Sequence, residues 1–159
     1  MALNEHSYSV QVRWTGNRGT GTSSYRSYGR SHTVASAGVP ELLGSADATF
    51  HGDRDRWNPE LLLVTALAQC HMLSYLHVAV QAGVVVTDYT DSAEGTMVLN
   101  PDGSGQFSSV TLRPRVRLAD PAQADLANSL HADAAGKCFI ARSVNFPVHH
   151  QPWAGGRGA

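Results

Sequence analysis

The longest apolar stretch of the chain runs from Trp57 to Gly83 and has the pattern of a long helix. Asn58 can cap its start, Pro59 suits the first helical position, and Glu60 suits the positive N-terminal end. Gly83 is a natural stop. Between these ends apolar residues occupy every face, and a helix that is apolar all round is usually buried. The pattern therefore predicts a long buried helix at the centre of the fold.

Polar side chains within this stretch argue against a membrane span. Gln69, His71 and His77 interrupt its apolar residues, whereas a spanning helix needs about 20 mostly apolar residues. The first ten residues are polar and lack the basic-then-apolar pattern of a signal sequence. We therefore expect a cytoplasmic protein without a membrane partner.

Residues 7–14, before the long helix, and residues 107–118, after it, alternate between polar and apolar side chains, as strands with one solvent-exposed face do. Turn-rich sequence follows the first of them at residues 15–24 and returns at residues 100–105. A second helix is predicted from Asp120 to about Ala135, with Gly136 as its break. The predicted strands cover residues 7–14, 25–35, 84–89, 94–99, 107–118 and 145–150. This order indicates an α+β fold with antiparallel sheets around a long central helix, rather than a doubly wound sheet.

The composition fits one ordinary domain. The chain has 159 residues, 42% of them hydrophobic and 16% charged, which is enough to bury a core without disulfides or a structural metal. We predict a single domain over residues 1–150 and a disordered tail over residues 151–159. The formal net charge of -1 gives no electrostatic case for nucleic acid or an anionic membrane.

The candidate chemistry lies in two cysteines, Cys70 in the middle of the long helix and Cys138 beyond the second helix. Two buried, inert thiols are the plain alternative, since free cysteine is among the most buried residue types. A reactive Cys70 needs a nearby cation because burial raises the pKa of a thiol. An arginine from another segment suits this role, since it stays charged when desolvated.

Other chemistries fit the sequence less well. A thioredoxin-like dithiol is disfavoured because no CxxC motif is present. A zinc site could combine Cys70 and Cys138 with His149 and His150, but no pair has the usual finger spacing. Glu60 lies ten residues before Cys70, or about 15 Å along a helix, so it could orient an arginine that reaches across. It could equally serve only the helix dipole.

The sequence from Asn58 to Cys70, NPELLLVTALAQC, resembles the central-helix signature of the OsmC/Ohr family of thiol peroxidases. In that family a cysteine follows the glutamate of an Asn-Pro-Glu helix start by ten residues, as Cys70 follows Glu60. A second cysteine near the end of the family's domain is similar to Cys138. The early TGNRGT sequence resembles the family's Gly-rich loop, which carries an arginine and would make Arg18 the functional one.

This resemblance implies a peroxidase that needs no cofactor or metal. Cys70 would be the attacking thiolate, stabilised by Arg18, with Glu60 orienting the arginine. Attack on a peroxide would yield a sulfenic acid at Cys70, and Cys138 would condense with it to a disulfide. An external thiol or dithiol would then reset the pair. The resemblance also implies an intertwined homodimer with the central helices packed together.

The chain departs from the family pattern after its second cysteine. Phe139 and Ile140 follow Cys138, where the Ohr and OsmC branches have a Cys-Pro run, so the chain resembles an OsmC-like side branch. The apolar setting of Cys138 and Trp57 favours organic hydroperoxides over hydrogen peroxide. Arg26 and Arg30 are rivals to Arg18 for the activating role.

Two classes of function therefore stay open. The first is a cysteine-based peroxidase acting on organic hydroperoxides. The second is a non-enzymatic, dimeric binding protein for a small apolar ligand, with both thiols inert. A metal site at the thiols is a third and weaker alternative.

Overall fold

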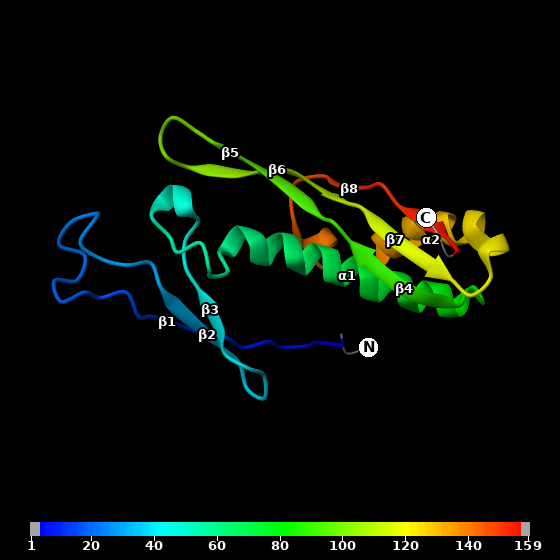
Figure 1. The fold of residues 1–159 in the computed structure, drawn as a ribbon, viewed down its shortest axis with the longest axis horizontal. Coiled ribbons are helices and arrows are strands. Elements are labelled where there is room, and N and C mark those ends of the chain that lie inside the picture. Colours follow the sequence, from blue (N-terminus) through cyan, green and yellow to red (C-terminus); the bar gives the residue numbers. More distant parts are fainter. Residues whose placement is uncertain (1–3, 157–159) are drawn as a thin grey trace. The chain divides into compact units, whose positions relative to one another are not determined.

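The helices and strands follow the predicted α+β order (Figure 1). The computed structural model describes residues 4–156, and the chain groups into two units, residues 1–62 and 63–159. The strands are β1 Gln11–Trp14, β2 His32–Ala35, β3 Leu42–Gly44, β4 Val86–Asp91, β5 Glu94–Leu99, β6 Gly105–Leu112, β7 Pro114–Leu118, β8 Val148–His150 and β9 Trp153–Gly155. The helices are α1 Pro59–Gln81 and α2 Ala124–Lys137, with 3-10 turns at η1 Ala48–Phe50, η2 Pro121–Gln123 and η3 Ala141–Ser143.

In the first unit, β1, β2 and β3 form an antiparallel sheet. The predicted strand over residues 25–35 is wrong before residue 32, where the backbone turns instead. The reason is that the guanidinium of Arg30 donates to the carbonyl oxygens of Tyr25 and Tyr28, at 2.6 Å each. These bonds curl the segment around one side chain, so its carbonyls do not join a ladder.

The long helix α1 starts and ends as predicted. The Asn58 side chain accepts a hydrogen bond from the Leu61 backbone N–H at 2.8 Å, which satisfies one of the free donors of the first turn. Gly83, just beyond the helix, has φ 72°, a left-handed conformation that glycine adopts without strain.

Only one face of α1 is covered in the single chain. Its buried residues are Leu67, His71, Tyr75, Val78 and Ala79, which recur at helical spacing. On other faces, by contrast, Leu73 is 62% exposed and Val80 is 77% exposed. The prediction of burial on every side is therefore wrong for the isolated chain.

By length and hydropathy alone α1 could cross a membrane. It has 23 residues, and its most apolar window has a mean hydropathy of 1.5. The core helix of a soluble protein passes the same test, so these two properties do not distinguish the two cases.

Two mixed sheets build the second unit, with strand orders β4-β7-β9 and β5-β6-β8. The predicted hairpin is confirmed as the antiparallel pair β5–β6, and β4 pairs antiparallel with β7. In each sheet the last strand pairs in parallel, β8 with β6 and β9 with β7. The predicted strand over residues 107–118 divides at Arg113, whose backbone N–H donates to the Asp91 side chain at 2.7 Å instead of to a strand.

The segment predicted as a disordered tail, residues 151–159, holds a strand. Trp153–Gly155 form β9 against Arg115–Arg117, and Ala154 is 6% exposed within the core. That part of the prediction is wrong because alanine and glycine let this strand lie against a packed layer. Residues 157–159 lie outside the described residues, and a single domain over residues 1–150 stays a prediction.

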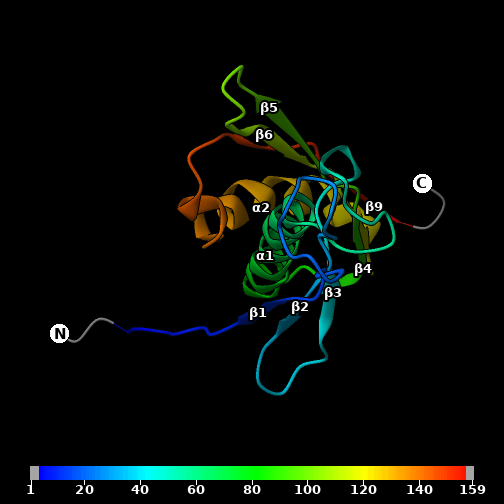
Figure 2. The same ribbon diagram turned by 90° about the vertical axis from the view of Figure 1, so that its left-hand side faces the viewer.

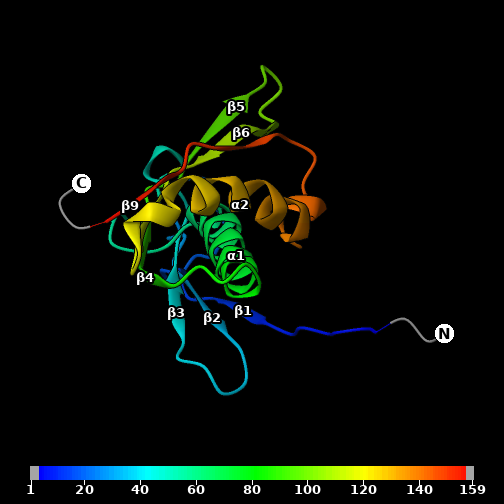
Figure 3. The same ribbon diagram turned by 90° about the vertical axis from the view of Figure 1, so that its right-hand side faces the viewer.

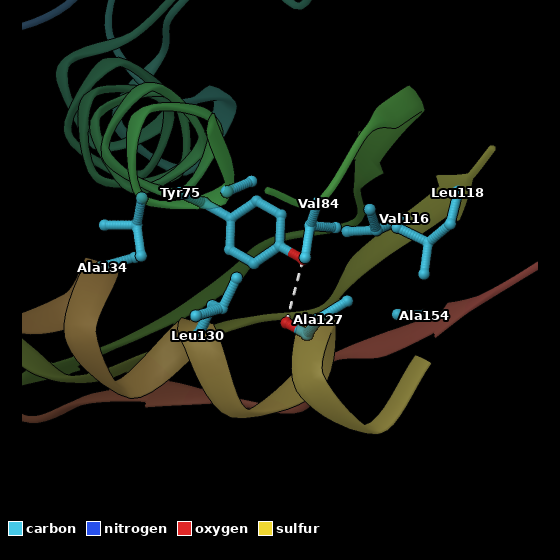
Figure 4. Packing of buried hydrophobic residues seen from close by; sticks show 10 residues of the cluster. Tyr75, Val84, Val116, Leu118, Ala127, Leu130, Ala134 and Ala154 are labelled. Carbon is cyan, nitrogen blue, oxygen red and sulfur yellow. Dashed lines mark hydrogen bonds between the residues drawn. The ribbon is translucent and has the colours of Figure 1, made fainter. Parts of the chain in front are cut away.

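The main core lies where α1 meets α2 and the β4-β7-β9 sheet (Figure 4). Tyr75 occupies its centre, and its hydroxyl donates to the Ala127 carbonyl of α2 at 2.9 Å. Seen along α1, α2 runs across it (Figure 2, Figure 3). The second helix was predicted to break at Gly136 but continues to Lys137, since one glycine in a last turn costs only about 1 kcal/mol.

Candidate active site

The structure brings Cys70 and Cys138 together. Cys70 is half-buried near the middle of α1, and Cys138 is the residue that ends α2 and is 1% exposed. Both are free thiols. They interact closely enough for the Cys70 thiol to raise the pKa of Cys138. The sequence separation of 68 residues gave no sign of this contact, which the crossing of α1 and α2 creates.

The environment of Cys138 holds its thiol protonated. Burial, and to a smaller extent the neighbouring Cys70, raises the pKa of Cys138 to about 11. The backbone N–H of Ala141 donates to the Cys138 sulfur at 3.4 Å and acts in the opposite direction, since a donor favours the thiolate. Cys138 is therefore a poor first nucleophile at neutral pH, and Cys70 is the better candidate.

A cavity of about 500 Å³ lies between α1 and the end of α2 with the turn that follows it. Ser74 and His77, four and seven residues after Cys70, line one side of it together with Leu73, as helical spacing requires. Gly136, Lys137, Phe139 and Arg142 line the other side around Cys138. The cavity combines an apolar surface with basic side chains.

Glu60 and Arg30 share a different cavity, within the first unit. This cavity of about 320 Å³ is also lined by the aromatic side chains of Trp14, Tyr28 and Phe50. One carboxylate oxygen of Glu60 is buried without a hydrogen-bond partner, which is costly unless a donor reaches it. The free oxygen of Glu60 therefore favours a role in binding an arginine over a role that serves only the helix dipole.

The three candidate arginines differ in their burial and in the groups that they contact. Arg30 is half-buried, and its guanidinium also lies over the rings of Tyr25 and Tyr28, at 4.6 and 4.0 Å. Arg18 and Arg26 are exposed. No ion pair joins Arg18 to Glu60 within residues 4–156. Since Arg18, Arg30 and Glu60 belong to the first unit and both cysteines to the second, the action of an arginine on Cys70 stays a prediction.

A buried histidine cluster lies next to Cys70 in the sequence and was not predicted. His71 Nε2 and His131 Nδ1 are 2.9 Å apart, so one ring donates to the other. The His150 ring lies 4.4 Å from that of His71, and the Tyr75 ring stacks on His131 at 4.0 Å. Burial, with smaller effects of neighbouring imidazoles, lowers the pKa of His71 to about 3 and that of His131 to about 4.

The geometry gives no support to the metal alternative. Within residues 4–156, no group of three or more His, Cys, Asp or Glu side chains is arranged to hold a metal ion. His71 and His131 are instead satisfied partly by each other, and His150 packs against them.

The sequence also matches a family model. Residues 51–151 fit the model of the OsmC-like proteins, a match that covers most of the chain and includes both cysteines. The chain belongs to the OsmC-like family. A comparison with curated protein sequences gave no match.

Solved structures of OsmC-like proteins have the same fold. An OsmC-like protein of unknown function from Vibrio cholerae is 28% identical, with a TM-score of 0.84 over 93% of this chain and 99% of that one. An organic hydroperoxide resistance protein from Legionella pneumophila is 17% identical, with a TM-score of 0.69 over 98% and 99% of the two chains. OhrB of Bacillus subtilis, also an organic hydroperoxide resistance protein, is 19% identical, with a TM-score of 0.64 over 94% and 98%. In this OsmC-like fold, α1 is the longest helix.

Proposed function

We propose that this OsmC-like protein is a thiol-dependent peroxidase that reduces organic hydroperoxides. The observation that carries the proposal is that Cys70, in the middle of α1, lies near enough to Cys138, at the end of α2, to act on the Cys138 thiol. Two free cysteines in contact, one half-buried and one fully buried, are what a nucleophile and a resolving thiol require.

The proposed cycle starts at Cys70. Its thiolate attacks one oxygen of the hydroperoxide, the O–O bond breaks, and an alcohol leaves once the departing oxygen takes a proton. Cys70 is then a sulfenic acid. The sulfur of Cys138 attacks the Cys70 sulfur, the hydroxyl leaves as water with the proton from Cys138, and a disulfide forms. Two electrons from an external thiol or dithiol restore both thiols.

An arginine and Glu60 complete the proposed site. Arg18 would stabilise the Cys70 thiolate, because a guanidinium keeps its charge in a partly dry site, and the unpartnered oxygen of Glu60 would orient it. The exposed apolar residues Leu61 and Val80, toward the two ends of α1, support a homodimer in which a second copy packs on this helix. We place the protein in the cytoplasm, where thiols are kept reduced.

The cavity next to the cysteines supports organic substrates. Its lining offers Leu73 and Phe139 to an apolar group, and burial of apolar surface favours binding by about 25 cal/mol per Å². The same cavity also supports the second function, a binding protein for a small apolar ligand whose thiols stay inert.

Thiol titration of the native protein distinguishes the two functions. With one equivalent of cumene hydroperoxide, we expect both thiols to be lost together within seconds and a disulfide between Cys70 and Cys138 to appear in the peptide masses. Hydrogen peroxide should react more slowly. If both thiols survive a tenfold excess of hydroperoxide, the protein is not a peroxidase and the binding function is the better account.

The activating arginine can be identified by comparing two variants. Arg18→Gln is expected to lower the rate of Cys70 oxidation by roughly 10- to 100-fold, the effect of about 1.4–3 kcal/mol of lost charge stabilisation. Its unfolding midpoint should stay unchanged because Arg18 is exposed. Arg30→Gln should instead lower the unfolding midpoint, since it removes both carbonyl contacts of the loop. A normal oxidation rate in Arg18→Gln with a slow one in Arg30→Gln would assign the role to Arg30. Stopped-flow oxidation and thermal unfolding give the two readings.

A further inference from the structure

The two sulfur atoms of the proposed disulfide differ in access. Cys138 is 1% exposed, whereas Cys70 is half-buried. Thiol–disulfide exchange depends on which sulfur the incoming thiolate can reach, and on the pKa of the thiol that leaves. An incoming thiolate therefore reaches the two sulfur atoms of the disulfide to different extents.

The chain after α2 folds over the Cys138 sulfur. The Ala141 N–H donates to that sulfur at 3.4 Å, and the Arg142 N–H donates to the Cys138 carbonyl at 3.1 Å. Ile140 and Ala141 also pack on the core that surrounds Leu67. These contacts close the approach to Cys138 from the side of its own turn.

Leu73, Ser74 and His77, which follow Cys70 on α1 at helical spacing, line one side of the cavity of about 500 Å³. The cavity gives a small thiol room to stand next to this face. Lys137 and Arg142 at its other side favour an incoming thiolate over a cationic thiol.

We propose that the reducing thiol enters from this cavity and attacks the sulfur of Cys70, so that the mixed disulfide forms on Cys70 and Cys138 is the thiol released. This inference rests on the proposed function, since it concerns the disulfide that function produces. It adds the site of attack and a role for the turn at residues 138–141 in holding the leaving sulfur.

The incoming thiolate forms a bond to the Cys70 sulfur while the Cys70–Cys138 bond breaks, and the electron pair goes to Cys138. Cys138 then takes a proton from solvent. A second thiolate attacks the sulfur of the first reductant, which releases a small disulfide and leaves Cys70 reduced. Two thiols are oxidised for each protein disulfide reduced.

Leaving-group chemistry alone favours the opposite direction. Burial raises the pKa of Cys138 to about 11, and a thiolate of high pKa leaves slowly. Accessibility determines which sulfur is attacked, because the reductant cannot react with a sulfur atom that it does not reach. The Ala141 N–H assists departure, since it stabilises the thiolate that forms.

The burial of Cys138 also lengthens the lifetime of the mixed disulfide on Cys70. Once released, Cys138 is protonated at neutral pH, and a protonated thiol does not attack back. The Cys70 adduct therefore lasts long enough to meet a second thiol.

The test maps the adduct by mass. The native protein is oxidised with diamide, so that disulfide formation does not depend on peroxidase activity, and then treated briefly with 2-mercaptoethanol at pH 7. After an acid quench, denaturation and alkylation of free thiols, peptide masses locate the 2-mercaptoethanol adduct. We expect at least ten times more adduct on Cys70 than on Cys138. Equal amounts, an excess on Cys138, or failure of diamide to form the disulfide would overturn the proposal.

Two further readings sharpen the test. The same exchange in urea should give nearly equal adducts, because unfolding makes both sulfurs accessible, and a tenfold bias that persists in urea would overturn the role of access. After removal of free thiol, closure of the mixed disulfide should be about 100-fold faster at pH 9 than at pH 7, since each pH unit below the pKa raises the thiolate fraction tenfold. A closure rate independent of pH would overturn Cys138 as the released thiol. Failure of the proposed function would appear separately, as no disulfide with hydroperoxide despite a normal result with diamide.

Discussion

Cys70→Ser is expected to lose organic hydroperoxide reduction by about a thousandfold or more. A serine hydroxyl is not ionised at neutral pH and cannot cleave the O–O bond, so no first step of the cycle remains. The loss should leave the fold intact because Cys70 is half-buried and serine is similar in size. The measurement is the loss of cumene hydroperoxide with excess dithiothreitol, followed in a coupled assay.

Cys138→Ser is the matched variant. It keeps the attacking thiol, so it should consume about one equivalent of hydroperoxide in a first turnover and then accumulate oxidised Cys70. Without a resolving thiol, further peroxide should take Cys70 to the sulfinic acid, 32 mass units above the thiol. Full activity in Cys70→Ser would refute the proposed mechanism, and full turnover without sulfinic acid in Cys138→Ser would remove the resolving role.

The protein is expected to lose stability steeply as the pH falls from 7 to 5. The pKa values of His71 and His131 are lowered to about 3 and about 4, so the unfolded chain binds protons in this window that the folded chain does not. Stability is therefore full above the unfolded pKa of about 6.5 and falls below it by about 1.4 kcal/mol per pH unit for each histidine. The two together predict a loss of about 4 kcal/mol between pH 7 and pH 5.

Urea unfolding at each pH measures this effect, and variants assign it. His150 on β8 faces His71 and also has a lowered pKa, with burial as the main cause, so it adds to the same slope. Replacing both His71 and His131 with leucine should remove most of the slope. His77→Gln, an exposed change on the same helix, should leave it unchanged. A slope that survives the double leucine variant would show that other groups cause the acid sensitivity.

Much of the fold could be predicted from the sequence because its signals are local. The Asn58 cap, the Gly83 stop and the alternation within residues 107–118 act within a few residues of themselves, and all appear in the structure. The parallel strand β9 could not be predicted, since Trp153–Gly155 owe their pairing to Arg115–Arg117, nearly 40 residues earlier. The loop after residue 25 was mistaken for a strand because Arg30 captures its carbonyls, which no periodicity reveals.

The two cysteines of the candidate site could be identified from the sequence, but the histidine cluster next to them could not. Cys70 and Cys138 were identified from their positions and from the family resemblance, and the Cys70 thiol lies near enough to raise the pKa of Cys138, while their catalytic roles stay a prediction. The histidine cluster was missed, because His71 and His131 meet only where α1 crosses α2. Spacing along one segment carries no sign of a contact 60 residues away. The buried unpartnered oxygen of Glu60 likewise depends on how the first unit folds around it.

The position of β9 has a consequence for how the protein forms in the cell. Ala154 is part of the core that surrounds Tyr75, and β9 lies against β7 in parallel. A ribosome must therefore release the chain as far as residue 155 before this core can close, although α1 and most of the strands emerge much earlier. During that interval the core face of α1 has no complete cover, and transiently exposed apolar surface of this kind favours aggregation. A chain truncated after residue 150 would lack β9 and could not complete this core.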